Sequence, residues 1–228
     1  MNISYAVVLS LFVIILIYLY WRFYFFFRDP GRNIPEGDNI VSPADGTIVY
    51  IRKVENNIVP ISIKNKKEIK LDEILRFRNI DLKFPYWIIG IFMHPTDVHV
   101  NRAPISGIVE KIIYTKGSNL PMTMMWLRVL LKRKPYEFYS PHVFINERNT
   151  ICIKGDFPLC ITQIADIYVN RIESWVNEGD EIRKGQKIGI IKMGSQVDFI
   201  FPCKPNIEII GKEGQRVKAG ESIIATIK

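Results

Sequence analysis

The sequence of 228 residues predicts a mainly β (α+β) fold preceded by one N-terminal membrane helix. Three observations predict it. An almost uninterrupted apolar stretch occupies residues 3–21, and after a turn-rich linker the chain breaks into short apolar runs separated by Gly, Pro and Asn/Asp turns. The third observation is internal repetition within the β-like part. We therefore expect residues 1–27 to form a membrane anchor and residues 28–228 to form one β-rich domain.

The apolar stretch has the length and flanks of a membrane span. At 1.5 Å per residue, a helix of this length approaches the ~30 Å thickness of the bilayer hydrocarbon. Only two residues precede it, whereas a signal peptide needs a basic segment there. The aromatic cluster at 21–27, together with Arg22 and Arg28, resembles an interfacial belt with its positive flank. We therefore expect the domain on the cytoplasmic side of a cell membrane; the alternative is a buried helix of a soluble protein.

Two internal echoes predict how the β-rich domain is built. The pattern E-G-x-x-[IV]-x-x-G-x-x-I occurs at residues 178–188 and at 213–223, and P-x-x-G-x-[IV] occurs at 43–48 and at 104–109. Glycines suit the points where such units turn, and the apolar residue between them points inward. These units resemble the halves of biotinyl and lipoyl carrier domains. The sequence therefore predicts a flattened β-barrel or sandwich with hammerhead-like quasi-repeats.

One segment departs from the β pattern. Residues 121–134 begin with Pro121, are dense in Met and Leu, and end in a run of basic residues. After the proline they predict about three helical turns with a cationic end. Two interpretations stay open, namely an interfacial helix that dips into lipid near the active site, or a core helix with a solvated basic end.

Charge and cysteine usage restrict the partners only partly. The formal net charge is +8 and the pI is about 9.3, which favours anionic partners such as nucleic acid or an anionic membrane. The three cysteines, Cys152, Cys160 and Cys203, are odd in number and form no C-x-x-C pair. This pattern predicts ordinary thiols in a reducing compartment, without a disulfide framework or a metal site.

Three short fragments contain residues with catalytic chemistry. His99 lies in a segment rich in polar residues, Asp45 lies in a Ser-Pro-Ala-Asp-Gly turn, and Gly194-Ser195 follows an apolar run. Each fragment has an ordinary structural interpretation when taken alone. These are a core histidine, a turn aspartate and a hairpin turn.

Taken together, these fragments resemble a known family. The resemblance is to the phosphatidylserine decarboxylase proenzymes, and more closely to their short form, from about residue 26 to the C-terminus. No single fragment is specific, but six of them occur in the same order with sensible gaps. The six are FFRDP at 26–30, SPADG at 42–46, DVHVNRAP at 97–104, NER at 146–148, QIA at 163–165 and GS at 194–195.

The resemblance implies a lyase that makes its own pyruvate cofactor. The hydroxyl of Ser195 would attack the carbonyl of Gly194, and β-elimination would leave a pyruvoyl group at position 195. Residues 1–194 and 195–228 would become a large and a small chain that stay associated as a heterodimer. The pyruvoyl carbonyl would then form a Schiff base with the amine of a serine phospholipid and act as an electron sink for decarboxylation to the ethanolamine lipid.

The resemblance also implies roles for two side chains. His99 would be the base in cleavage or the proton donor after decarboxylation, and Asp45 would orient His99 and stabilise its charged form. Arg102 stands where longer bacterial members carry a second histidine, so His99 acts in both steps or another group, His94 or His142, assists. Gln196 stands where many members have Thr.

The lipid tails are not readable from the residues. A bacterial enzyme would meet ester-linked phosphatidylserine, and an archaeal one would meet ether-linked archaetidylserine. The short form and the Ile/Lys-rich composition favour the archaeal lipid slightly. A phospholipid substrate and a membrane are the expected partners in either case.

Two other classes of function compete with this interpretation. A membrane-tethered carrier or binding module is suggested by residues 190–193, which resemble the Met-Lys-Met of a biotinyl domain, but Lys192 follows Gly185 by only seven residues and lacks matching flanks. A nucleic-acid binder is suggested by the charge alone. No RNP, KH, zinc-finger or helix-turn-helix pattern is present and the basic residues are dispersed, so no nucleic-acid partner is expected.

Overall fold

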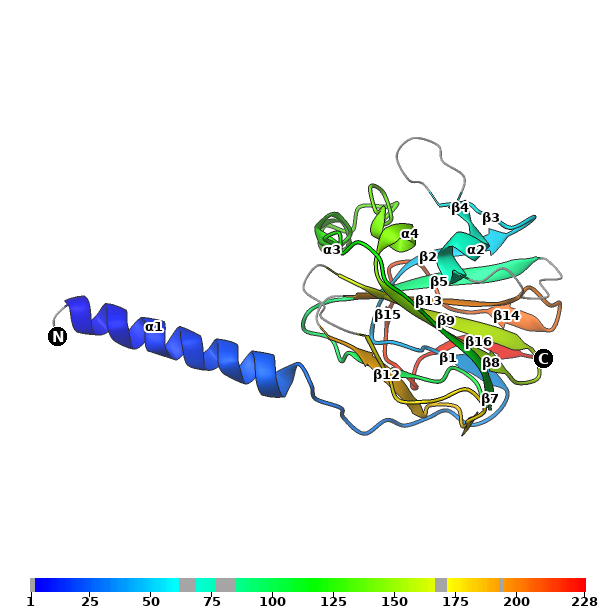
Figure 1. Ribbon diagram of the computed structural model, residues 1–228, viewed down its shortest axis with the longest axis horizontal. Coiled ribbons are helices and arrows are strands. Elements are labelled where there is room, and N and C mark those ends of the chain that lie inside the picture. The colour runs from blue at the N-terminus through cyan, green and yellow to red at the C-terminus, as the bar shows by residue number, and fades with distance from the viewer. Residues whose placement is uncertain (1–2, 62–68, 77–84, 167–171, 193–194) are drawn as a thin grey trace.

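The N-terminal helix is separate from the β-rich domain and projects from it. The computed structural model describes residues 3–61, 69–76, 85–166, 172–192 and 195–228. Helix α1 (Ile3–Tyr20) continues into a π-helical turn, η1 (Trp21–Phe25), and both extend away from the β-rich part (Figure 1). The segment Val7–Phe25 is long and apolar enough to cross a membrane, and none of it is buried. The helix is therefore not the core helix of a soluble domain.

The domain is built on an eight-stranded antiparallel sheet with the strand order β11-β7-β8-β9-β13-β5-β2-β15. The sheet is curled like half a barrel (Figure 1), which confirms the mainly β prediction. Strand β13 lies at its centre between β9 and β5, and every one of its residues is buried. The strands are β2 (Gly46–Val54), β5 (Tyr86–Met93), β7 (Gly107–Thr115), β8 (Arg148–Lys154), β9 (Pro158–Ala165), β11 (Glu181–Ile182), β13 (Ser195–Pro202) and β15 (Arg216–Val217).

Two smaller sheets pack against one face of the large sheet. Their strand orders are β1-β16-β14 and β10-β12-β6, and they enclose a core of mostly aliphatic side chains. Because successive residues of a strand point to opposite faces, Val197 and Phe199 of β13 belong to this core. The strands are β1 (Asn39–Val41), β6 (Val100–Arg102), β10 (Ile172–Ser174), β12 (Lys187–Ile191), β14 (Ile207–Ile209) and β16 (Ile223–Ile227).

The other face is covered by short helices and a hairpin. A second core forms there, and Ile200 of β13 contributes to it. The covering elements are α2 (Leu71–Leu75), α3 (Thr123–Leu130), α4 (His142–Ile145) and the hairpin of β3 (Ile58–Val59) with β4 (Ile69–Lys70). The helix predicted over residues 121–134 is α3, which is shorter than expected and buries only Met125 fully.

The internal echoes occupy equivalent places in the sheet. Gly179 donates its N–H to the carbonyl of Val109 at 2.8 Å, and Gly214 donates its own to Ile48 at 2.7 Å. Each unit then adds a two-residue strand, so that β11 pairs with β7 and β15 pairs with β2 at opposite edges of the sheet. Both glycines have φ near +90°, a conformation that favours glycine. The hammerhead likeness of these units stays a prediction.

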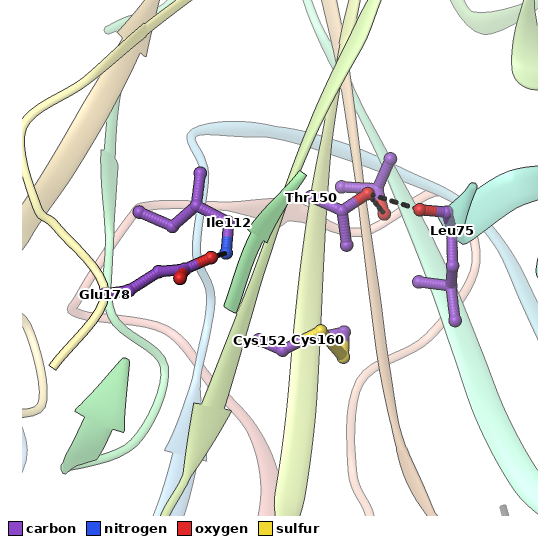
Figure 2. The surroundings of a disulfide bond; sticks show 7 residues. Leu75, Ile112, Thr150, Cys152, Cys160 and Glu178 are labelled. Atoms are coloured by element: carbon purple, nitrogen blue, oxygen red, sulfur yellow. Dashed lines mark hydrogen bonds between the residues drawn. A yellow bond between two sulfur atoms is a disulfide. The ribbon is translucent and has the colours of Figure 1, made fainter. Parts of the chain in front are cut away.

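The prediction of ordinary thiols is wrong for two of the three cysteines. Cys152 and Cys160 form a disulfide between β8 and β9 (Figure 2), and Cys203 is free. The two are direct partners in the register of this hairpin, a relation that sequence spacing alone does not reveal. Nearby, Thr150 of β8 donates its hydroxyl to the carbonyl of Leu75 at 3.0 Å (Figure 2). Cysteine usage therefore no longer argues for a reducing compartment.

Candidate active site

Ser195 is the first residue of the central strand β13. It pairs with Met93 at the end of β5 on one side and with Ala165 at the end of β9 on the other. Its side chain is fully buried, and its Oγ lies 3.2 Å from the Sδ of Met93. A thioether is a weak acceptor, so no strong hydrogen bond holds the hydroxyl. Gly194, the expected partner in cleavage, lies outside the described residues.

The strand that follows His99 runs beside the segment that leads to Ser195. His99 directly precedes β6, which pairs with β12, and the N–H of Ile191 donates to the carbonyl of His99 at 3.3 Å. Only three residues then separate Ile191 from Ser195. Asn101 of β6 reaches the Sδ of Met93 at 3.8 Å, the same sulfur that Ser195 contacts. The structure therefore brings the His99 segment and Ser195 together around Met93.

The ring of His99 is buried and carries an unpartnered nitrogen. Its Nδ1 lies 3.0 Å from the carbonyl oxygen of Asp97, so we assign Nδ1–H as the donor. Its Nε2 has no hydrogen-bond partner among the described residues. Phe26 packs on the ring with centroids 4.2 Å apart. Burial lowers the pKa of His99 to about 4, and the nearby charge of Arg28 acts in the same direction. His99 is therefore neutral at pH 7 with an available lone pair.

Asp45 is engaged by other groups than His99. Its two carboxylate oxygens each accept from Nη2 of Arg32 at 3.0 Å, and its Oδ1 accepts from the N–H of Ala219 at 2.7 Å. Its turn lies beside β6, because the N–H of Arg102 donates to the carbonyl of Pro43 at 2.9 Å. The expected hydrogen bond to His99 is absent among the described residues. The backbone carbonyl of Asp97 orients the imidazole instead.

Arg102 holds the linker that follows the anchor. Its guanidinium donates to Asp29 at 2.6 Å and to the carbonyl of Gly185 at 3.0 Å, and Lys187 forms a further ion pair with Asp29. The FFRDP fragment thus contacts the candidate site twice. Phe26 packs on the ring of His99, and Asp29 accepts a hydrogen bond from Arg102. The position that bears a second histidine in longer members is used here to fix the linker.

The opposite face of β13 carries a buried polar cluster. The amide of Gln196 donates to the hydroxyl of Tyr50 at 2.8 Å and to Asp198 at 2.6 Å, and its carbonyl oxygen lies 3.3 Å from Nε2 of His142. Of these residues, sequence analysis singled out Gln196 and His142 but missed Tyr50 and Asp198. The available signal was the alternation of polar residues 196 and 198 in a strand whose residues from 199 to 202 are all apolar.

Burial sets the protonation of this cluster. It raises the pKa of Asp198 to about 6, raises the pKa of Tyr50, and lowers the pKa of His142 to about 4. Arg148 supplies the neighbouring positive charge. Its guanidinium donates at 3.0 Å to the carbonyls of Ile74, Val143 and Asn146, which tie α2 and α4 to the sheet.

An open pocket of about 460 Å³ lies at the corner where the linker meets the His99 segment. Arg216 pairs there with both oxygens of Asp97, and Arg28 donates to the carbonyl of Thr96 at 2.5 Å. Three cationic side chains line the pocket against two carboxylates, because Lys218 and Asp45 also contribute. This excess of positive charge suits an anionic ligand.

Lys192, the residue on which the carrier interpretation depends, does not stand free. Its ammonium pairs with Glu173 at 2.6 Å, and about two thirds of its side chain is covered. A lysine that carries a prosthetic group protrudes from a hairpin, so this ion pair argues against the carrier function.

Comparison with known proteins agrees with the resemblance seen in the sequence. Residues 19–225 match the family described as phosphatidylserine decarboxylase. A protein from Methanocaldococcus jannaschii named "Putative archaetidylserine decarboxylase proenzyme" is 40% identical over 205 residues, which cover 88% of this chain and 87% of that protein. A phosphatidylserine decarboxylase proenzyme from Carboxydothermus hydrogenoformans is 36% identical over 217 residues, with 94% and 84% coverage. A third, from Solibacter usitatus, is 35% identical over 202 residues, with 88% and 76% coverage.

Proposed function

This chain belongs to the phosphatidylserine decarboxylase family, and we propose that it cuts itself before Ser195 and then decarboxylates a serine phospholipid to the ethanolamine lipid. It is a carboxy-lyase anchored by α1, with its catalytic domain on the cytoplasmic side of the membrane. The observation that supports the proposal is that the buried His99, whose Nε2 has no partner among the described residues, directly precedes the strand that pairs with β12, and only three residues separate β12 from the buried Ser195.

The cleavage uses only groups of this chain. Nε2 of His99 accepts the proton as Oγ of Ser195 bonds to the carbonyl carbon of Gly194, and the C–N bond breaks to leave an ester and a free amine at residue 195. Loss of the Cα proton then breaks the Cβ–Oγ bond and releases the carboxylate of Gly194. The enamine left at residue 195 hydrolyses to a pyruvoyl group and ammonia. Because the pyruvoyl group is made at residue 195 itself, this internal reaction precedes the reaction with lipid.

The surroundings of residue 195 fit a pyruvoyl group. The thioether of Met93 gives Ser195 an apolar neighbour, and the nearby His99 segment supplies a buried Nε2 that has no partner among the described residues and that we propose holds or delivers a proton there. The bound group supplies a carbonyl that condenses with an amine and accepts the electrons released as carbon dioxide leaves. Nε2 of His99 would take up the proton that the lipid ammonium loses before it condenses, and would then deliver that proton to the former α-carbon of the lipid. The cationic pocket with Arg28 and Arg216 binds the phosphodiester of the head group.

The large and small chains stay associated after cleavage. Strand β13, the first element of the small chain, pairs with β5 and β9 along its length and is buried throughout. Asp45 adds a tie between the two chains through the N–H of Ala219. On the far face, Gln196 anchors the new N-terminus of the small chain to Tyr50. We therefore expect a tightly bound heterodimer.

The test supplies both substrate classes to the purified full chain in bilayers. Ester-linked phosphatidylserine and ether-linked archaetidylserine are added separately, and the ethanolamine lipid and carbon dioxide are measured beside a Ser195→Ala variant. The proposal predicts product from at least one lipid with the normal chain and none with the variant. A self-cleaved chain that converts neither lipid would contradict the proposed substrate class, and the ratio of the two rates assigns the lipid tails.

A further inference from the structure

Exposed apolar side chains gather around α3. Of the eleven large hydrophobic residues that are exposed among the described residues after position 28, six fall between 124 and 139. We call these six the α3 patch. They are Met124, Leu127, Leu130, Leu131, Phe138 and Tyr139, and Leu130 is the most exposed at 60%. Such a concentration exceeds the scattered single hydrophobics of an ordinary protein surface.

The exposed charges that residues 120–139 contribute around the α3 patch are all positive, and one of them, Lys134, pairs with Glu213 at 3.7 Å. Arg128 lies beside it, and three consecutive exposed basic residues, Lys132 to Lys134, follow it. The single acidic residue between positions 120 and 139 is Glu137, which is fully buried and paired with Arg52 at 2.7 Å. An apolar surface rimmed by cations matches the boundary of a bilayer that contains anionic lipid.

Contacts connect the α3 patch to the end of the anchor. The ring of Trp126 in α3 lies 6.1 Å from that of His94, whose Nδ1 lies 2.8 Å from Oγ1 of Thr96. The carbonyl of Thr96 accepts from Arg28, whose guanidinium stacks 3.8 Å from the ring of Phe25 at the end of the membrane helix. His94 directly follows Met93 in the chain, and the Sδ of Met93 contacts Oγ of Ser195. The α3 patch therefore lies on the same edge of the domain as the end of the membrane helix and the candidate site.

The orientation of α3 fits a helix that lies along a membrane. In Figure 1, α3 is on the side of the domain that faces α1, and it is seen almost along its axis while α1 runs across the picture. A bilayer crossed by α1 would therefore meet α3 sideways, with its exposed apolar residues at the boundary between head groups and acyl chains.

We propose that the α3 patch is a lipid-contact surface that rests in the same bilayer as α1 and favours anionic lipid. Because Trp126 of α3 lies against His94, the residue that directly follows Met93, this surface is also the route by which a lipid head group approaches residue 195. That route rests on the proposed function, whereas the lipid contact itself does not. A second copy of this chain is the alternative occupant.

Lipid contact is tested by fluorescence quenching in the full chain. In a Cys203→Ser background, three variants each carry a single new cysteine labelled with the same fluorophore. The test position is Leu130. The controls are Leu16 in the anchor and Ile210, an equally apolar residue after β14. The chains are reconstituted with lipids brominated on their acyl chains. Strong quenching is expected at position 16. The fluorophore at position 130 is expected to lose about half its fluorescence, since an interfacial helix buries its apolar face about 5–10 Å deep. The fluorophore at position 210 is expected to lose little fluorescence.

Each other outcome overturns the lipid-contact proposal. Equal signals at positions 130 and 210, with quenching at 16, would place the α3 patch in water. No quenching at 16 would remove the bilayer on which the proposal depends. If the fluorescence at position 130 varies with protein concentration but not with brominated lipid, the α3 patch contacts a second copy of the chain. Quenching at 130 is also expected to be stronger in bilayers with anionic lipid than in zwitterionic ones.

A kinetic comparison tests the substrate route separately. The double variant Leu127→Asp/Leu130→Asp is expected to decarboxylate bilayer lipid at least ~10-fold more slowly, while a short-chain, monomeric serine phospholipid is processed at the normal rate. Equal losses on both substrates would contradict the route. If the normal chain converts neither substrate while position 130 is still quenched, the proposed function fails and the lipid contact stands.

Discussion

The two faces of strand β13 differ in how their polar groups are satisfied. On one face, Ser195 meets the thioether of Met93, and the nearby segment that pairs with β12 contains His99, whose Nε2 has no partner among the described residues. On the other face, one residue further along, Gln196 is held by Tyr50, Asp198 and His142. Of these two adjacent residues, Gln196 is therefore held by three side chains, whereas the hydroxyl of Ser195, which we propose as the nucleophile, contacts a weak acceptor.

The two buried histidines show what this difference means. Burial lowers the pKa of both His99 and His142 to about 4, so both are neutral at pH 7. His142 uses its Nε2 toward Gln196, whereas the Nε2 of His99 has no partner among the described residues. Burial and pKa alone therefore do not mark the base. The available lone pair is what distinguishes His99, which we propose as the base, and this distinction is open to experiment.

The largest expected effect is on the rate of self-cleavage. His99→Gln is expected to slow cleavage about 10²–10⁴-fold, the usual contribution of a positioned general base. The matched variant His142→Gln is expected to alter stability while cleavage stays within about tenfold of normal, because it acts only on the anchoring face. Cleavage is followed by gel electrophoresis of freshly folded chain, with circular dichroism as a control. Similar rates for the two variants would remove the contrast between the faces.

The next effect is on stability at the anchoring face. Arg148→Met is expected to lower the free energy of unfolding by about 3 kcal/mol or more, because three buried carbonyls lose their donor at a cost of about 1–3 kcal/mol each. Urea unfolding of the Ser195→Ala background gives this value without cleavage. A loss below about 1 kcal/mol would show that the carbonyls find other partners.

Acid is expected to destabilise the chain through its buried histidines. Their pKa is about 4 in the folded chain against 6.5 in the unfolded one, so the unfolded state binds more protons between these values. The stability they contribute is complete above pH 6.5 and is lost as the pH falls toward 4, at up to about 1.4 kcal/mol per pH unit for each histidine. Thermal unfolding between pH 4 and 8 measures this, and a flat profile would contradict it.

A smaller effect separates Asp198 from the histidines. The pKa of Asp198 is about 6 in the folded chain and 3.8 in the unfolded chain, so Asp198 binds a proton on folding between these pH values. This proton uptake opposes the loss of stability that the histidines cause in acid. Asp198→Asn removes that opposition. The variant is therefore expected to be more stable than the normal chain at pH 7 and to lose stability more steeply between pH 6 and 4. Parallel profiles for the two proteins would assign the slope to other groups.

Much of the fold was readable because it depends on local patterns. The exposed apolar N-terminal helix follows from an uninterrupted apolar run, and the equivalent edges at β11 and β15 follow from glycines that the turns require. The pairing of Cys152 with Cys160 was missed, since it depends on the register of one hairpin. Helix α3 ended earlier than predicted, after Leu130.

The candidate site was readable only in part for a similar reason. Ser195, His99 and Asp45 lie in recognisable fragments, but their partners come from distant parts of the chain. Arg32 lies in the linker and reaches Asp45, a contact that no local pattern predicts. Tyr50 and Asp198 were missed because a buried polar pair across three strands becomes visible only when the strands are assembled.

The most direct test of the central claim is the intact mass of the full chain reconstituted in bilayers, beside its Ser195→Ala variant. The account predicts two fragments from the normal chain, one ending at Gly194 and one spanning 195–228 with a blocked N-terminus of pyruvoyl mass, and a single whole chain from the variant. If the normal chain also remains whole, Ser195 is only the buried start of a strand and the self-cleaving mechanism is contradicted.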